Sequence, residues 1–228
     1  MKFRVIFVTA FVGILTLISC QKNINTARLS SEIDTISYYI GLSIGSNLKE
    51  SPLKDINYLA LAKGLKDAQD NDELEYDPYE INMKITSYME KLESSQSQSN
   101  LLEGEAFLEK NKNRTDVTTL ESGLQYRIIR EGSGPKPILT DNVTVHYHGT
   151  LIDGTVFDSS VDRGEPVTFP LNGVIQGWQE ALQLMPVGSK WEIFIPTGLA
   201  YGENTAPGGP IKPNMALIFE VELLSIDE

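Results

Sequence analysis

The chain has 228 residues, of which 41% are hydrophobic and 22% charged, an ordinary balance for a globular protein with one large or two small domains. Its formal net charge of -12 argues against nucleic acid as a partner, because phosphates require patches of Lys and Arg. The same charge suits a soluble surface that repels its own copies.

The N-terminal segment MKFRVIFVTAFVGILTLISC has the pattern of an export signal. Lys2 and Arg4 precede an apolar run from Val5 to Ile18, which is short for a membrane span and has the length of a signal-peptide core. The only cysteine of the chain, Cys20, follows directly after LIS. This resembles the lipobox of bacterial lipoproteins, whose cysteine receives lipid and becomes the mature N-terminus. A plain secretory signal with an incidental cysteine is the alternative.

We therefore expect residues 1–19 to be a lipoprotein signal peptide, Cys20 to be lipidated, and residues 20–31 to be a polar tether. The mature chain would hold no other cysteine, which excludes disulfides and thiol catalysis. Position 21 is Gln rather than Asp, which in Gram-negative lipoproteins favours delivery to the outer membrane. The expected location is the cell envelope, lipid-anchored at the outer membrane and facing the periplasm.

Residues 32–114 have helical patterns throughout. Large apolar residues recur every three or four positions, as in an amphipathic helix: Ile33, Ile36, Ile40, Ile44 and Leu48. Gly41 and Gly45 lie one turn apart on this helix, where they cost helix stability but allow another helix to approach closely. Asp55 is a candidate cap for a second helix with Leu59, Ala62 and Leu65 on one face.

A third helix is predicted to begin at DPYE, with Asp77 as N-cap, Pro78 at the first position and Glu80 at the third. The segment ESSQSQSN, residues 93–100, interrupts its apolar pattern, so it is either a flexible linker or the solvated middle of a long helix. An unbroken helix from Pro78 to Asn113 would be roughly 54 Å long. It would protrude or pair with a second copy, because so small a domain cannot bury it.

The hydrophobic period changes to that of strands after about residue 115. Alternating or β-branched runs are found at Leu124–Glu131, Asn142–Leu151, Lys190–Pro196 and Met215–Ile226. One helix is predicted at about Gly177 to Leu184. We therefore expect residues 115–228 to form an α+β domain, an antiparallel sheet with a single short helix on its apolar face.

Conventional catalytic sets are not found. His146 and His148 would share one face of a strand without a third ligand at metal-site spacing, so we expect exposed strand histidines and no metal. The segment DGTVFDSSVDRGE lacks the spacing of a calcium-binding loop and is interpreted as a turn, a strand and a loop. There is no nucleophile elbow and no phosphate-binding glycine loop.

Aromatic residues stand out instead. Tyr147 would face inward, opposite the two histidines, and further aromatic residues are Phe157, Phe169, Trp178, Tyr201 and Phe219. Val174 and Ile175 precede the helix that carries Trp178. Spacing alone leaves open whether these rings form an ordinary core or a binding pocket.

The second half closely resembles the FKBP-type peptidyl-prolyl isomerases from about Leu120 to Ile226. The resemblance is carried, in order, by VTVHYHGTLIDGTVFDSSVDRGEPVTFPL, VIQGWQEALQLMPVGSKWEIFIP, LAYGE and LIFEVELL. It implies a five- or six-stranded antiparallel sheet around one short helix. It also implies peptidyl-prolyl cis-trans isomerase activity without a cofactor, and binding of macrolide inhibitors of the tacrolimus and rapamycin type.

The resemblance places the site on particular residues. The implied catalytic residues are Tyr147, Phe157, Asp158, Trp178 and Tyr201, and the implied substrate-binding residues are Arg163, Phe169, Val174, Ile175, Ile211 and Phe219. Trp178 would be the floor under the substrate proline, and the Ile175 amide and the Tyr201 hydroxyl would hold substrate carbonyls. Departures from the family pattern are Val167, Ala206-Pro207 and Lys212-Pro213, which bear on sequence preference and inhibitor affinity.

The first half resembles the helical N-terminal domain of two-domain bacterial FKBPs of the macrophage infectivity potentiator type. DTISYYIGLSIGSNLK, LAKGLKDAQ and the segment from EGEAFLEKNK to SGPKP carry this likeness. It implies a homodimer through residues 32–114, with a monomer whose helices fold back on themselves as the alternative. The leading function is folding of proline-containing unfolded or nascent exported polypeptides. The alternatives are a holdase whose helical cleft binds non-native chains, and a module that binds a fixed partner.

Overall fold

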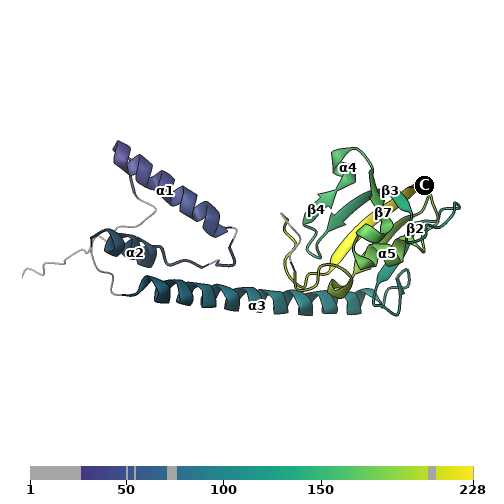
Figure 1. Cartoon of the computed structure of the whole chain (residues 1–228), viewed down its shortest axis with the longest axis horizontal. Helices are drawn as coiled ribbons and strands as arrows, with labels where there is room; N and C mark the ends of the chain where they lie inside the picture. Colours follow the sequence, from purple (N-terminus) through teal and green to yellow (C-terminus); the bar gives the residue numbers. More distant parts are fainter. Residues whose placement is uncertain (1–26, 50, 54, 71–75, 205–208, 228) are drawn as a thin grey trace, which may run out of the picture. The chain divides into compact units, whose positions relative to one another are not determined.

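The computed structural model describes residues 27–49, 51–53, 55–70, 76–204 and 209–227. The chain divides into two compact units, Met1–Asp55 and Ile56–Glu228, and each is considered by itself (Figure 1). The predicted signal peptide, the lipidation residue Cys20 and the Ala206-Pro207 pair lie outside the described residues. Within the described part of the chain, no helix is long and apolar enough to cross a bilayer.

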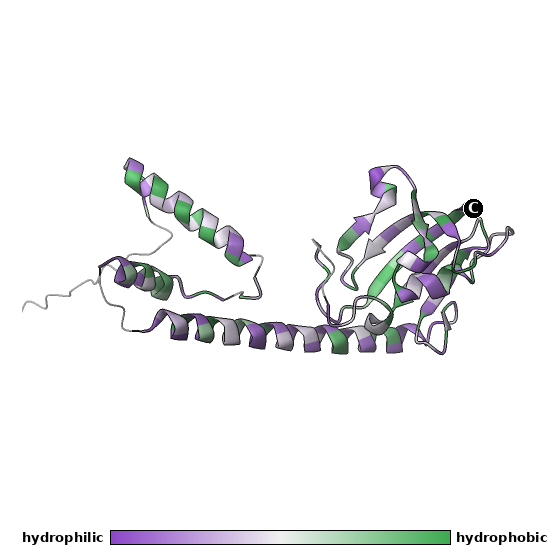
Figure 2. Ribbon diagram, viewed as in Figure 1, coloured by the Kyte–Doolittle hydropathy of each residue, from purple (hydrophilic) through white to green (hydrophobic). Residues whose placement is uncertain are grey.

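In the first unit, helix α1 spans Glu32–Lys49 and buries none of its residues. Its start is fixed by reciprocal hydrogen bonds, because the Asp34 amide donates to Ser31 Oγ (3.2 Å) and the Ser31 amide donates to Asp34 Oδ2 (2.9 Å). The apolar pattern of the sequence is present but uncovered: Ile33 is 69% exposed, and green bands recur along α1 in Figure 2.

Helix α2 spans Tyr58–Asp70, and its cap is Asn57 rather than the predicted Asp55. The Oδ1 atom of Asn57 accepts hydrogen bonds from the amides of Leu59 and Ala60, each at 3.1 Å. Asn57 stands directly before the first helical residue, where a short side chain reaches the free amides of the first turn. Asp55 lies too far from that turn to cap it.

Helix α3 spans Pro78–Asn111 without a break, about 50 Å at 1.5 Å per residue. Asp77 caps it as predicted, since its Oδ1 accepts from the Tyr79 amide at 2.7 Å. The polar segment 93–100 is therefore helical and not a linker. The helix ends two residues before the predicted Asn113.

The C-terminal part of the second unit is an antiparallel sheet. In the described residues its strands are β1 (Thr118–Thr119), β2 (Gln125–Arg130), β3 (Asn142–Thr150), β4 (Val156–Ser159), β5 (Val167–Pro170), β6 (Lys190–Ile195) and β7 (Leu217–Asp227). Their order is β1-β2-β6-β7-β3-β4, with β5 also paired to β3. These described strands exceed the implied five or six, partly because the two-residue β1 adds an edge. The predicted α+β class is confirmed.

Among the described residues, two α-helices interrupt the strands, not the single one predicted. The main helix, α5, spans Gln176–Leu182, and α4 is one turn at Ser160–Arg163. Two short 3-10 helices, η2 (Leu171–Gly173) and η3 (Thr197–Leu199), complete the described elements. The extra turn forms because Ser159 Oγ accepts from the Asp162 amide at 3.1 Å, and Gly164 ends the turn with a φ of 82°.

The hydrophobic core lies between α5 and one face of the sheet. Its fully buried members include Val143, Val145, Leu182, Met185, Ile193, Ile195, Leu217 and Val221. Gly177 lets α5 lie close to the sheet, because a Cβ at this position would be 2.5 Å from Cγ2 of Ile195. This close approach fixes the position of the next residue, Trp178.

Candidate active site

Five aromatic residues from five elements meet beside α5, and we call them the aromatic cluster: Tyr147 (β3), Phe157 (β4), Phe169 (β5), Trp178 (α5) and Phe219 (β7). The ring centroid of Trp178 lies 5.3 Å from Tyr147, 5.2 Å from Phe219 and 6.0 Å from Phe169, each nearly perpendicular. Edge-to-face contact is the arrangement that aromatic pairs prefer. The structure thus brings together the aromatic residues predicted for the site, with the exception of Tyr201.

The cluster has a buried base and a half-exposed border. Trp178 is only 4% exposed, and its Nε1 atom has no hydrogen-bond partner among the described residues. Phe157 and Phe169 are half-buried and pack against the core that contains Trp178, with the ring of Phe169 on Trp178 and that of Phe157 on Phe219. An apolar surface of this kind suits an apolar ring of a ligand better than it suits a charged group.

Gly149 on β3 is a residue of the site that sequence reasoning missed. A Cβ at this position would lie 2.6 Å from Cε2 of Phe157 and 2.9 Å from Cε1 of Phe219. The two rings therefore occupy the space that a side chain at position 149 would need. A glycine inside the predicted strand, one residue before the end of β3, was the available signal, because glycine in a strand often marks a close approach.

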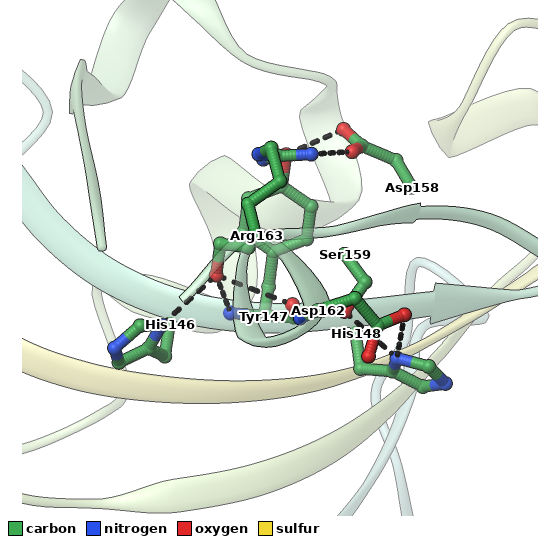
Figure 3. Close-up of polar contacts among 8 residues, drawn as sticks. His146, Tyr147, His148, Asp158, Ser159, Asp162 and Arg163 are labelled. Atoms are coloured by element: carbon green, nitrogen blue, oxygen red, sulfur yellow. Dashed lines mark hydrogen bonds and ion pairs between the residues drawn. The ribbon is translucent and has the colours of Figure 1, made fainter. Parts of the chain in front are cut away.

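A polar network borders the cluster (Figure 3). The hydroxyl of Tyr147 donates to Asp158 Oδ2 at 2.5 Å, and Arg163 Nη2 donates to that hydroxyl at 2.9 Å. Arg163 Nη1 pairs with Asp158 Oδ1, and the guanidinium lies 5.7 Å from the centroid of the Tyr147 ring. Asp158 is thereby held by both Tyr147 and Arg163.

The network sets the ionisation of its members. Burial alone would raise the pKa of Asp158, but hydrogen bonds from Tyr147 and Arg163 outweigh it and hold the pKa below the ordinary value of 3.8. Burial and the hydrogen bond to Asp158 raise the pKa of Tyr147, while the hydrogen bond to Asp158 raises that of Arg163. At neutral pH the network is a neutral phenol between a carboxylate and a guanidinium.

The two histidines lie on the opposite face of β3, as predicted, but they are half-buried and hydrogen-bonded rather than exposed. His146 Nδ1 lies 3.1 Å from Ser160 Oγ, and His148 Nδ1 lies 2.9 Å from Ser159 Oγ and 3.9 Å from Asp162 Oδ2. The short helix α4 covers this face, which explains the burial. Both Ser159 and Asp162 meet the same nitrogen of His148, so the three do not form a catalytic triad.

The residues before α5 present a free donor. Ile175 is the N-cap, and its carbonyl accepts from the amides of Trp178 (2.9 Å) and Gln179 (3.1 Å). Its own amide has no acceptor among the residues that the structure describes. Gln179 Nε2 donates to the Val174 carbonyl at 2.7 Å and so ties this segment to the helix. The first amides of a helix are the groups that a ligand carbonyl can meet.

Tyr201 and Ile211 are placed differently from the cluster. Tyr201 is 36% exposed in a turn after η3, and its hydroxyl makes no hydrogen bond to a described residue. Ile211 is 4% exposed and belongs to the buried core that includes Trp178. Val167, at the position where an aromatic residue is usual, is half-buried against the same core. Little of Ile211 is therefore available at the surface.

Comparison with known proteins places this geometry in a family context. Residues 134–224 match the family model of FKBP-type peptidyl-prolyl cis-trans isomerase, and residues 33–128 match that of the domain amino terminal to it. Outer membrane protein MIP of Legionella longbeachae is 42% identical over 96% of each chain. The FKBP-type 22 kDa peptidyl-prolyl cis-trans isomerase of Escherichia coli is 49% identical over 83% of this chain and 93% of that protein.

A solved structure agrees with the sequence matches. The crystal structure of FkpA from Escherichia coli is similar with a TM-score of 0.68 and 34% sequence identity. The match covers 88% of this chain and 99% of that one. The likeness thus extends over the N-terminal helices as well as the sheet.

Proposed function

The chain belongs to the FKBP-type peptidyl-prolyl cis-trans isomerases of the two-domain bacterial class, and we propose that it catalyses this isomerisation at the aromatic cluster. The observation that carries the proposal is the edge-on packing of Tyr147 and Phe219 around the buried Trp178. A proline ring has the size and apolar character to rest on such a base. The free amide of Ile175 lies at the N-terminus of α5, three residues before Trp178.

The mechanism follows from the bond that is turned. Resonance gives the X–Pro bond its barrier of about 18–20 kcal/mol, and the planar ground state carries more charge separation than the twisted transition state. An apolar site therefore disfavours the ground state relative to the transition state. In this proposal the Ile175 amide and the Tyr201 hydroxyl hold the carbonyls on either side while the imide rotates against Trp178 and Phe157.

The polar network has a supporting role in this proposal. The hydroxyl of Tyr147 donates a hydrogen bond to Asp158 and accepts one from Arg163. These two bonds fix the ring that forms one wall of the cluster. The ionised Asp158 also offers an acceptor at the rim. The apolar lining would be completed by the half-buried Val174 and Phe169, and by the buried Ile211 beneath them.

The direct test is isomerisation of a short X–Pro peptide by the full chain. For Trp178→Leu and Tyr201→Phe we expect kcat/KM to fall at least about tenfold, which corresponds to about 1.4 kcal/mol of transition-state stabilisation. Trp191→Phe is the matched control, because that indole is also buried but stacks on Tyr126 on another part of the sheet. Unchanged kcat/KM in both site variants would refute the proposal.

We further propose that residues 32–114 form a homodimer and that residues 115–228 carry the isomerase site. The uncovered apolar side chains of α1 support this, since a helix without buried residues gains stability from a second copy. Two catalytic domains held apart by α3 helices would suit unfolded exported polypeptides. A relative named as an outer membrane protein supports the cell envelope as the location. Cys20 would provide the lipid anchor there, on the periplasmic side of the outer membrane.

The same exposed side chains of α1 favour holdase activity as a second candidate function. A holdase would delay aggregation of a client that contains no proline, and it would do so after mutation of Trp178. Isomerase activity would be lost in that variant. Tacrolimus or rapamycin would compete with the peptide at the cluster and leave holdase activity unchanged.

A further inference from the structure

The polar segment 93–100 of α3 contacts the loop that precedes β7. Asn100 is only 5% exposed, and its Nδ2 donates to the Pro213 carbonyl at 2.8 Å. Gln96 Nε2 donates to Asn100 Oδ1 at 2.9 Å and orients the amide group for this contact. One turn earlier, Ser97 Oγ accepts from Asn214 Nδ2 at 2.8 Å. The segment is therefore bound to the catalytic part of the chain by side chains that a hydropathy pattern does not reveal.

The loop that receives these bonds is tied to the turn that carries Tyr201. The amide of Asn214 donates to the carbonyl of Gly202 at 2.7 Å, and the Gly202 amide donates to the Thr197 carbonyl at 3.0 Å. Asn214 has a φ of 60°, a left-handed conformation that Asn tolerates better than most residues. Ser97, Asn214 and Gly202 thus form a continuous chain of hydrogen bonds that ends next to Tyr201.

The contact belongs to a longer seam along α3, which makes it a defined interface. A Cβ at Gly104 would lie 3.2 Å from Cβ of Ala216, and the ring of Phe107 lies 5.9 Å from that of Phe194. At the end of the helix, Asn111 Nδ2 donates to Gln125 Oε1 at 2.9 Å within the buried seam. These contacts fix the position of α3 against the sheet, and Ser97 and Asn100 meet the loop at the other end of the same seam.

We propose that Ser97 and Asn100 are positioning residues for the isomerase site. They hold the Pro213–Asn214 turn, which in turn holds the backbone beside Tyr201. This inference rests on the function proposed above, in which the Tyr201 hydroxyl binds a substrate carbonyl. Without the two anchors, the turn visits arrangements in which the hydroxyl is misplaced. Only the aligned fraction binds substrate, so the apparent KM rises while kcat is retained.

The test compares full-length variants on a short X–Pro peptide, with KM and kcat determined separately. For Ser97→Ala combined with Asn100→Ala, we expect KM to rise about 2- to 10-fold, the factor that corresponds to loss of one or two net hydrogen bonds. The matched control is Ser95→Ala combined with Gln98→Ala, which alters the exposed side of the same helix. Asn214→Gly removes the side chain that donates to Ser97, so the KM of this variant should also rise. Glycine at this position tolerates the left-handed backbone conformation.

Rescue distinguishes positioning from a general loss of structure. Ser97→Thr keeps the hydroxyl acceptor, so it should retain the wild-type KM that Ser97→Ala loses. Equal KM values for the double variant and its control, or equal defects in Ser97→Thr and Ser97→Ala, would overturn the inference. A fall in kcat at unchanged KM would overturn it as well. Absence of wild-type activity on the peptide would instead refute the proposed function itself.

Discussion

The rings of Phe157 and Phe219 meet edge-on above Gly149, with their centroids 5.2 Å apart and their planes at 84°. Gly149 is paired in the sheet with Phe219 on one side and with Asp158 on the other. The backbone of β3 thus supports both the aromatic cluster and the strand that carries its polar border. Space at a single α-carbon decides whether these rings can meet.

Substitution of Gly149 should therefore displace the rings of Phe157 and Phe219. In Gly149→Ala the new methyl group would overlap with both rings, and overpacking of this kind costs about 1–3 kcal/mol of folding stability. We expect a lower unfolding midpoint and a reduced kcat/KM on a short X–Pro peptide. Gly198→Ala is the control, because a Cβ at Gly198 would meet no described atom within 4 Å. If both variants behave alike, the rings do not depend on this space.

The Asp158 network predicts a dependence of stability on pH. The pKa of Asp158 is held below 3.8 in the folded chain, so its carboxylate stabilises the fold above pH 3.8. This contribution is lost as the pH falls from 3.8 through the lower folded-state pKa. In Asp158→Asn the contribution is absent, and the free energy of unfolding should fall less steeply in this acid range than it does in the wild type.

Urea unfolding at a series of pH values between neutrality and strong acid measures this difference. The gap between the free energies of unfolding of the wild type and Asp158→Asn should be constant near neutral pH. This gap should narrow as the solution is acidified. Glu131→Gln removes an exposed carboxylate away from the site and should keep the acid dependence of the wild type. A gap that widens on acidification would contradict the assigned direction of the pKa shift.

The residues differ in how far their places could be predicted from sequence. The alternation of β3 predicts that Tyr147 faces inward, away from His146 and His148, because the period of a strand is two. The resemblance to the family adds Trp178, whose role spacing alone left open. The turn of α4 depends on local capping by Ser159, and four residues are too few for a periodic signal.

The anchors on α3 illustrate a different limit. Ser97 and Asn100 lie in a run of polar residues that suits either a linker or a solvated helix, and hydropathy does not separate their sides. Their partners are more than a hundred residues further along the chain. Only the packing of the helix against the sheet determines which of these polar side chains faces protein, so a single sequence gives no signal for it.

Lipid attachment at Cys20 can be tested without reference to the fold. On expression in Escherichia coli, the wild type should incorporate labelled palmitate and sediment with membranes. Cys20→Ser should lose the label and the membrane association, because no other cysteine is available in the chain. Short-peptide isomerase activity should be unchanged. Release of the wild type as a soluble, unlabelled chain would instead indicate a plain secretory signal.

The apolar face of α1 allows the proposed dimer to be tested separately from catalysis. Ile36 and Ile40 are both exposed, one turn apart, and a carboxylate buried at either position in a dimer would lack a partner. Such a charge costs several kcal/mol, so Ile36→Glu with Ile40→Glu should raise the dissociation constant at least about 100-fold. Sedimentation of the chain from Gln21 onward should then show monomers. Ser46→Glu adds charge on the side of the same helix that lies opposite the row of isoleucines, and this variant should remain dimeric.

The two activities should separate in the monomeric variant. Isomerisation of a short X–Pro peptide depends on the aromatic cluster, so its kcat/KM should match the wild type. Refolding of a client protein whose folding is limited by proline isomerisation should slow, because a monomer can no longer hold the client between two catalytic domains. Equal loss of both activities would show that α1 supports the fold of the catalytic site rather than the capture of clients. Full retention of both activities would show that dimerisation through the helical domain is not needed for the proposed function.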